Sequence, residues 1–323
     1  MTAPTRKPSS KKRAASKPAL TAEQKAEKAE ARAERVQALT ESIEARLHTL
    51  SEQLAQGKSD ALKAWLGTMA KFHQYSWNNQ LLILCQRPEA GMVAGFHRWK
   101  ELGRSVKKGA KGIAILRPFT VPDRDAPPQA DGRHSQKLVG FGFCYVFADC
   151  DTDGEGELPG SNFMHVHGDQ NLMRQLERFT EQAAEQGIRV DWEQCGATTY
   201  GYTDGGRIVL DREKCAAEPG NATRTFFHEW AHIVLHFQGQ GKRPEDCPDR
   251  HTRELEADAC AYVLASHFGL DATLQVSDYV LLWGGSPDKL RASAPRIQRA
   301  VAQILRHLDV EAALQDDAVP AAA

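Results

Sequence analysis

The chain has 323 residues, of which 41% are hydrophobic and 26% are charged, and its formal net charge is −1. At about 150 residues per domain, this length predicts two domains and excludes a single small disulfide-stapled module. The longest purely apolar run, 259–265, is far shorter than the roughly 20 residues of a membrane helix. No apolar segment follows the cationic amino terminus, so we expect no secretory signal and a cytoplasmic protein.

The charge is divided unequally along the chain. Residues 1–150 carry 25 Lys and Arg against 14 Asp and Glu, whereas residues 151–323 carry 16 against 28. This asymmetry indicates a basic half that meets polyanions and an acidic half with another role.

The first half predicts an α+β domain over residues 36–150. It follows a charged tail at 1–35 that is expected to be partly disordered, although helical periodicity runs from 21 to 56 and becomes apolar from Val36. Ser59 and Ser76 are expected to cap two further helices, the second ending before Arg87-Pro88. A short helix at 96–102 and strands at 112–119 and 137–149 complete the domain.

The second half predicts a mainly helical domain over residues 163–315 with a small sheet. An acidic, glycine-rich linker at 151–162 precedes it, and a disordered end at 316–323 follows. The expected elements are helices at 169–186, 222–237, 252–268, 274–283 and 289–314, and a strand at 207–211 behind a turn at 203–206. That strand is either an exposed edge to which a peptide could add or an ordinary strand of the sheet.

The segment 228–232 fits the pattern H-E-x-x-H within a helical segment. His228 and His232 lie one turn apart, so both imidazoles project from one face and can bind one tetrahedral ion. Glu229 lies beside the first ligand, where it can take a proton from water at the ion and pass it to a leaving amine. The pattern predicts a zinc-metallopeptidase-like centre, with another divalent ion such as Mn²⁺ as the alternative.

A second helical segment offers the arrangement E-x-x-A-D about twenty residues downstream. Glu254 and Asp258 share a face, so Glu254 is the expected third ligand and Asp258 the carboxylate that orients a ligand histidine. Ala257 would let the two helices approach each other. Glu256, about 200° away, is the alternative ligand, and His236 would lie about 6 Å too far along the axis for easy ligation. Two amphipathic helices with solvated charges would also produce this pattern.

Cations and aromatic residues are interleaved in the first half. Eight cations lie between residues 87 and 117, against the two acids Glu89 and Glu101. Cations can contact phosphates, and aromatic faces can stack on unpaired bases, which favours a single strand over an intact duplex. Trp77 and Trp99 are also typical of half-buried packing residues. The candidate DNA-binding residues are Tyr75, Trp77, Arg87, Arg98, Trp99, Arg104, Lys107, Lys108 and Lys111.

Several segments in this region carry a family resemblance. They are YSWNNQLLIL (75–84), Arg87-Pro88, VAGF (93–96), Trp99, LGR (102–104) and KKGAKGIAIL (107–116). Together they closely resemble the amino-terminal domain of ArdC-type antirestriction proteins of conjugative plasmids. The second half resembles the zincin-like metallopeptidase domain of that family, which is related to the IrrE/ImmA group. Both resemblances occur in the family's order, over about residues 40–310.

The resemblance implies that the first domain binds single-stranded DNA and protects incoming plasmid DNA from host restriction endonucleases. It also implies a metal at His228, His232 and the E-x-x-A-D helix, without establishing that any protein is cleaved. The alternative function is a regulatory metalloprotease, guided by DNA, that cleaves a repressor or a restriction-system protein. In a third possibility the metal is structural.

Overall fold

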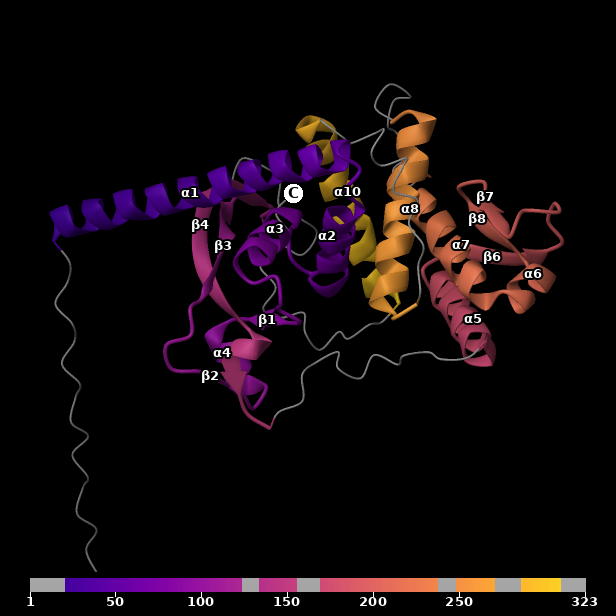
Figure 1. Cartoon of the computed structure of the whole chain (residues 1–323), viewed down its shortest axis with the longest axis horizontal. Coiled ribbons are helices and arrows are strands. Elements are labelled where there is room, and N and C mark those ends of the chain that lie inside the picture. Colours follow the sequence, from indigo (N-terminus) through magenta and orange to yellow (C-terminus); the bar gives the residue numbers. More distant parts are fainter. Residues whose placement is uncertain (1–20, 124–133, 156–168, 238–247, 271–285, 309–323) are drawn as a thin grey trace, which may run out of the picture.

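The computed structural model describes residues 21–123, 134–155, 169–237, 248–270 and 286–308. Within these ranges, the chain forms helices and three small sheets with the strand orders β1-β4-β3, β2-β5 and β6-β8-β7, which confirms the predicted α+β class (Figure 1). Over the same ranges, no helix is long and apolar enough to cross a membrane. The expected tail at 1–20, the helix at 274–283 and the end from 309 onward lie outside the described residues.

Helix α1 (Ala22–Ala55) begins at a capping box. The Thr21 hydroxyl accepts a hydrogen bond from the Gln24 N–H (3.2 Å), and the Gln24 side chain accepts one from the Thr21 N–H (3.1 Å). Residues 22–35, predicted as part of a partly disordered tail, are helical, and this half of α1 projects beyond the rest of the molecule (Figure 1). Burial begins at Leu39 and recurs every three or four residues, which packs only the second half of α1 on the core.

The rest of the first domain contains two predicted helices, a short third helix and a long hairpin. Ser76 occupies the N-cap position of its helix as predicted, although its side chain makes no capping hydrogen bond, whereas Ser59 is the first helical residue and Lys58 is the N-cap. The elements are α2 (Ser59–Lys71), α3 (Trp77–Gln86), β1 (Val93–Ala94), α4 (Phe96–Glu101), β2 (Ser105–Val106), β3 (Ile113–Pro122), β4 (Gln136–Ala148) and β5 (Thr152–Asp153). Strand β5 pairs with β2, so the segment predicted as a linker begins with a strand.

Strands β3 and β4 form an antiparallel hairpin whose two faces differ. Leu116 lies opposite Phe143 and Ile115 lies opposite Cys144, and directly opposed residues share a face of the sheet. Ile115 belongs to a small core beneath the hairpin that also contains Ile83 of α3. The pairing shifts by one residue between Phe119 and Thr120, so β4 bulges near the end of the hairpin.

Two side-chain amides of α3 take the place of a further strand at the outer edge of β3. Asn79 donates to the Leu116 carbonyl (3.0 Å) and accepts from the Leu116 N–H (2.9 Å). Gln86, two turns later, donates to the Ala114 carbonyl (2.9 Å) and accepts from the Ala114 N–H (3.0 Å). Each amide therefore satisfies both backbone groups of one strand residue. We call this arrangement the amide clamp.

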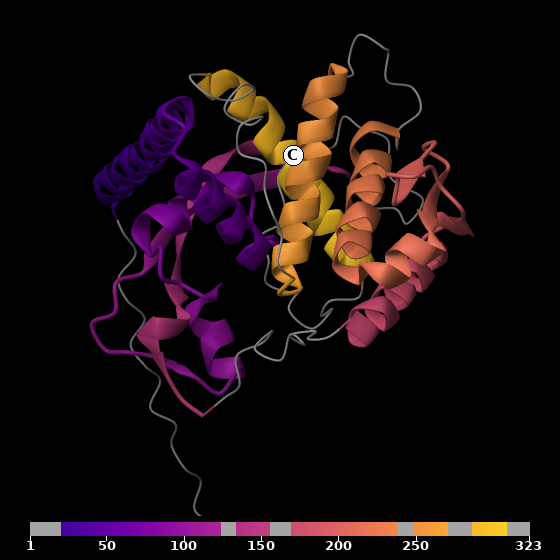
Figure 2. The ribbon, with the colours of Figure 1, turned by 45° about the vertical axis from the view of Figure 1, so that its right-hand side comes forward.

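The second half places its sheet and its helices as separate layers (Figure 2). Strand β8 is the central strand of its sheet, between β6 and β7. Of the two alternatives for 207–211, the ordinary strand is therefore confirmed and the exposed edge is wrong, and β7 forms an edge instead. The elements are α5 (Asp169–Glu185), β6 (Arg189–Glu193), β7 (Gly201–Thr203), β8 (Arg207–Asp211), α6 (Arg212–Ala217), α7 (Pro219–His232), a π-helical turn (Ile233–Phe237), α8 (Arg250–His267) and α10 (Pro287–His307).

One hydrophobic core runs through both halves. Buried residues of α1, α2 and α3 form a continuous cluster with buried residues of α7, α8 and α10. Helix α2 packs on α8, and α1 and α3 contact α10. The two predicted domains are therefore packed against each other, with α8 and α10 between the hairpin side and the β6-β8-β7 sheet (Figure 1).

Candidate functional site

Helices α7 and α8 lie side by side and bring the predicted metal-site residues together (Figures 1 and 2). Phe226, Phe227 and Trp230 are fully buried and anchor one side of α7 in the core. That anchoring leaves His228 and His232 on the side that faces α8. Small side chains of α8, including the fully buried Ala257, permit the close approach that the sequence predicts.

Three potential ligand atoms converge between the two helices. Nε2 of His228 lies 3.0 Å from Nε2 of His232, and each nitrogen lies 3.4 Å from Oε2 of Glu254. Three ligands of one tetrahedral ion have this spacing when each lies about 2.0–2.1 Å from the ion. Among the described residues, these three form the group of His, Cys, Asp and Glu side chains that could hold a metal ion.

Asp258 holds the other nitrogen of His228. Its Oδ1 lies 2.9 Å from Nδ1 of His228 and 3.5 Å from the guanidinium of Arg224. Burial alone would lower the pKa of His228, but the hydrogen bond to Asp258 and the charge of that carboxylate raise it overall. Burial opposes ionisation of Asp258, yet the contact with His228 keeps the pKa of Asp258 below its ordinary value.

Glu229 lies beside the three ligand atoms without joining them. Burial raises its pKa to about 7, against the opposing effects of His228 and of a hydrogen bond with the backbone of Thr203. A carboxyl group whose pKa is near neutrality can both accept and return a proton at neutral pH. Thr203 ends strand β7, so an edge of the small sheet runs next to this carboxyl group.

The two alternative ligands face other partners. Glu256 is fully buried, and its Oε1 accepts a hydrogen bond from Nε of Arg296 in α10 (3.0 Å). His236 donates from Nε2 to the Arg253 carbonyl (3.3 Å), and burial, followed by the charge of His232, lowers the pKa of His236 to about 4. The geometry therefore favours Glu254 over both as the third ligand.

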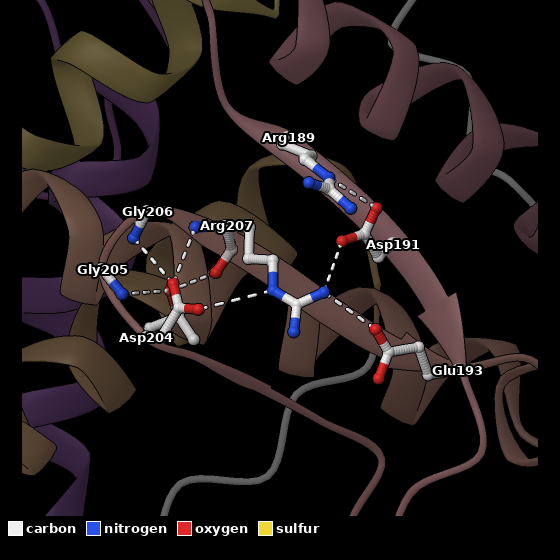
Figure 3. Close-up of polar contacts among 8 residues, drawn as sticks. Arg189, Asp191, Glu193, Asp204, Gly205, Gly206 and Arg207 are labelled. Atoms are coloured by element: carbon white, nitrogen blue, oxygen red, sulfur yellow. Dashed lines mark hydrogen bonds and ion pairs between the residues drawn. The ribbon is translucent and has the colours of Figure 1, made fainter.

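A single arginine fixes the strand that contacts Glu229 (Figure 3). The guanidinium of Arg207 pairs with Asp191 (2.6 Å) and Glu193 (2.8 Å) of β6 and with Asp204 (3.4 Å). Asp204 also accepts a hydrogen bond from the Arg207 N–H (3.0 Å) and so closes the predicted turn between β7 and β8. Arg207 thus ties β6 to the turn that follows Thr203.

The aromatic residues predicted to stack on bases are mostly packing residues. Trp99 is fully buried and donates from Nε1 to the Phe147 carbonyl (2.9 Å), and Trp77 is only 7% exposed. Tyr75 is half-buried, and its hydroxyl donates to the Val93 carbonyl (3.1 Å). The structure therefore does not present the ring faces of Trp77 and Trp99 to a ligand, and it supports the packing alternative for both.

The predicted DNA-binding cations are exposed or half-buried, and four of the six contact their own chain. Lys108 and Lys111 are exposed and make no hydrogen bond or ion pair with the described residues. The other contacts are Arg87 with Asp151 (3.0 Å), Arg98 with Glu101 (3.1 Å), Arg104 with Thr152 (2.9 Å) and Lys107 with Asp153 (3.5 Å).

A row of aromatic side chains on β4 was missed from the sequence. Phe141, Phe143, Tyr145 and Phe147 occupy every second position, and alternate residues of a strand share a face. Phe141 is 47% exposed and Tyr145 is 50% exposed. The signal available in the sequence is the alternation of aromatic residues with smaller ones inside the predicted strand 137–149.

The fold and the site together define a two-part chain. A basic α+β domain comes first, and a helical part follows whose H-E-x-x-H and E-x-x-A-D motifs form the candidate metal site. Residues 29–147 match the family model of the N-terminal domain of anti-restriction factor ArdC. The chain therefore contains an ArdC N-terminal domain over these residues, as the resemblance of its first half predicts.

Two solved structures are similar to the chain. The metal-free crystal structure of the antirestriction ArdC protein from the R388 plasmid is 17% identical, with a TM-score of 0.49 over 81% of this chain and 97% of that one. The Mn(II)-bound structure of the same protein is 16% identical, with a TM-score of 0.43 over 72% of this chain and 84% of that one. A comparison with curated proteins found no match.

Proposed function

We propose that the chain is an antirestriction protein whose first domain binds single-stranded DNA and thereby protects incoming plasmid DNA from host restriction endonucleases in the cytoplasm. The observation that carries the proposal is the match of residues 29–147 to the ArdC N-terminal domain. The match covers the β3–β4 hairpin and all the predicted DNA-binding cations, so the basic surface belongs to the part of the chain for which a family is known.

The distribution of charge supports a phosphate-binding role for this domain. From residue 61 to residue 122 the chain carries ten Lys and Arg against two acids. Lys108 and Lys111 are exposed in this stretch and free of ion pairs with the described residues. Exposed ion pairs such as that of Lys107 contribute little stability, so a phosphate can replace the carboxylate.

Zn²⁺ is the ion we propose for His228, His232 and Glu254, and Mn²⁺, which one R388 structure contains, is the second ion to test. Two imidazole nitrogens and one carboxylate oxygen suit either ion. When bound, such an ion polarises a water molecule or a carbonyl group. Asp258 would keep His228 in the tautomer whose Nε2 lone pair faces the ligand position. Glu229 would hold or release a proton beside it.

The second candidate function is a regulatory metalloprotease that uses DNA as a guide to a repressor or a restriction-system protein. The assembled site favours it, because Glu229 is placed as a base beside the three ligand atoms. Thr203 brings the edge strand β7 to the same carboxyl group, so an extended peptide paired with β7 would pass Glu229. If the metal is only structural, Glu229 has no chemical role.

The binding part is tested with the purified full chain and one labelled oligonucleotide, offered as a single strand and as a duplex. We expect the chain to bind the single strand more tightly than the duplex. If it binds the single strand no more tightly than the duplex, the proposal is contradicted. The protease alternative is tested by incubating the wild type and Glu229→Ala with candidate restriction-system proteins. Specific cleavage that is lost in Glu229→Ala would establish the protease, whereas intact proteins in both reactions favour protection by binding.

A further inference from the structure

We propose that the aromatic row of β4, composed of Phe141, Phe143, Tyr145 and Phe147 and extended by Phe96 of α4, is the surface on which unpaired bases of single-stranded DNA stack. The inference rests on the proposed function, because it names the residues with which the first domain would hold the strand. It replaces Trp77 and Trp99, whose rings are buried in the core.

Two pairs of rings in the row are in contact, one within β4 and one between β4 and α4. The rings of Phe143 and Tyr145 lie 5.6 Å apart, and those of Phe147 and Phe96 lie 6.3 Å apart. Alternate residues of a strand repeat every 6.8 Å or so. Bases stacked in a duplex repeat every 3.4 Å or so, hence only a strand whose bases are unstacked can place successive bases on successive rings.

The exposure of these rings is not explained by packing. Phe96, Phe141 and Tyr145 are 43%, 47% and 50% exposed, whereas Phe143, between the last two, is half-buried and packs against the main core. Of the nine large hydrophobic side chains that are exposed in the described part of the chain, three, Phe96, Phe141 and Tyr145, belong to the row. Exposed aromatic side chains that gather on one part of a surface are typical of a binding site.

The charges around the row favour a nucleic acid over an apolar or basic protein. Strands β3 and β4 contain no Asp or Glu, and their two cations, Arg117 and Lys137, lie on the face of Phe119, opposite to the row. Nζ of Lys100 lies 4.9 Å from the centre of the Phe96 ring at one end of the row. Aromatic faces combined with cations and without acids are the combination that binds single strands without reading their sequence.

A glycine brings the free lysines to the row. A Cβ atom at Gly112 would lie 3.0 Å from the Tyr145 ring, so the backbone passes against that ring at this point. Gly112 directly follows Lys111 and lies four residues after Lys108. The two cations without partners among the described residues thus precede the contact with Tyr145, where they can reach the phosphates of a strand that lies on the row.

The test measures binding of the full chain to a fluorescein-labelled oligothymidine of about 16 nucleotides. We compare the wild type with the double variant Phe141→Leu/Tyr145→Leu, which keeps apolar area but removes two ring faces. Stacking contributes about 1–3 kcal/mol per base, so we expect the loss of two ring faces to lower the affinity about 30-fold or more. The slope of log K against log salt should stay unchanged, because the phosphate contacts remain.

Two single variants serve as matched controls. Phe119→Leu removes an exposed ring of the same hairpin, but Phe119 lies opposite Gly140 and thus on the other face, so affinity should stay within about twofold of the wild type. Tyr145→Phe keeps the ring and should bind like the wild type. Thermal melting followed by circular dichroism checks that every variant is folded.

The outcomes separate the inference from the proposed function. If the wild type does not prefer the single strand, the proposed function fails and the inference fails with it. If the wild type binds but the folded double variant binds equally well, the row is not the stacking surface, while the proposed function stands. An equal loss of affinity in Phe119→Leu also overturns the inference. So does a lower sedimentation coefficient of the double variant than of the wild type, both without DNA, because it would show that the row is a contact between copies of the chain.

Discussion

His228 uses both of its ring nitrogens. Asp258 accepts from Nδ1, and a neutral imidazole that donates from Nδ1 keeps a lone pair on Nε2. Three carboxylates of α8 have different partners. Glu254 meets two histidines, Asp258 meets Nδ1 of His228, and Glu256 meets the guanidinium of Arg296. Their positions around the helix axis therefore decide their roles.

Removal of a ligand should remove the metal, whereas removal of the base should not. His228→Ala and Glu254→Ala are expected to lose bound metal, and Glu229→Ala to retain it, because Glu229 lies beside the ligand atoms. Asp258→Asn should weaken metal affinity about 10- to 100-fold, since the histidine is then less well oriented. Elemental analysis of the purified variants measures this. Full metal content in Glu254→Ala, together with loss in Glu256→Gln, would overturn the ligand assignment.

At the scale of elements, the amide clamp joins α3 to β3 without a strand partner. Asn79 is only 4% exposed and meets both backbone groups of Leu116, which have no other strand to pair with on that side. A buried backbone group without a partner costs about as much as a lost hydrogen bond. The clamp therefore couples the stability of the hairpin to that of the helix.

We expect Asn79→Ala to lower the free energy of unfolding by about 2–4 kcal/mol, because it leaves the N–H and the carbonyl of Leu116 without partners. Asn78→Ala, one residue earlier in the same helix, is the matched control and should change stability by less than about 0.5 kcal/mol. Urea unfolding followed by circular dichroism measures both. Equal stability of the two variants would show that the clamp is not needed.

The lysines of the loop between β2 and β3 should determine how strongly single-strand binding depends on the salt concentration. Neutralising Lys107, Lys108 and Lys111 together to Gln should weaken single-strand binding and reduce the salt slope by about 2, at 0.7 or so per phosphate contact. Lys107 already pairs with Asp153, so Lys108→Gln/Lys111→Gln alone should produce most of this change. Titrations at several salt concentrations give the slope. An unchanged slope in the triple variant would place the phosphate contacts elsewhere.

At the scale of the whole molecule, histidines lie at the junction of the two halves. His73 follows α2 and His267 ends α8, and their rings meet edge to face with centres 5.1 Å apart. Burial, followed by the charge of His267, lowers the pKa of His73 to about 4. The packing at the junction between the halves therefore favours the neutral form of the His73 ring.

This junction predicts loss of stability in acid. Between pH 6.5 and 4 the unfolded chain binds a proton at His73 that the folded chain does not, so the free energy of unfolding falls as the pH falls through that window. His73→Phe should remove on the order of 2 kcal/mol of this loss. Urea unfolding near pH 7 and near pH 4.5 tests it, with the exposed His48→Phe as control. The same acid sensitivity in His73→Phe and the wild type would contradict the assignment.

Conjugation tests the relation between the two halves. If protection comes mainly from DNA binding, Glu229→Ala should leave antirestriction largely intact, because Glu229 lies on α7 and the exposed lysines precede β3 in the other half. Transfer into restricting and non-restricting recipients is compared for the wild type and Glu229→Ala at equal protein levels. A collapse confined to the restricting recipient would favour the protease.

The local patterns of the sequence predict much of this molecule, and contacts between distant segments account for what they miss. The spacing of His228 and His232 follows from helix geometry alone, whereas Glu254 lies on α8 and meets the two histidines because α8 packs on α7. The place of β8 within its sheet depends on β6 and β7, which are short and have no strong pattern of their own. The burial of Trp99 depends on β4, 40 residues and more away, as its bond to the Phe147 carbonyl shows.

The amide clamp also affects how copies of the chain can pair when they are crowded together. A protein that covers a DNA strand is held at high local concentration next to copies of itself, and open strand edges in that setting invite sheet-to-sheet pairing and aggregation. Asn79 and Gln86 occupy the edge of β3 at Leu116 and Ala114, and Pro118, two residues further, has no N–H to offer. Copies that cover one strand of DNA, as the proposed function requires, would therefore find this edge closed to them.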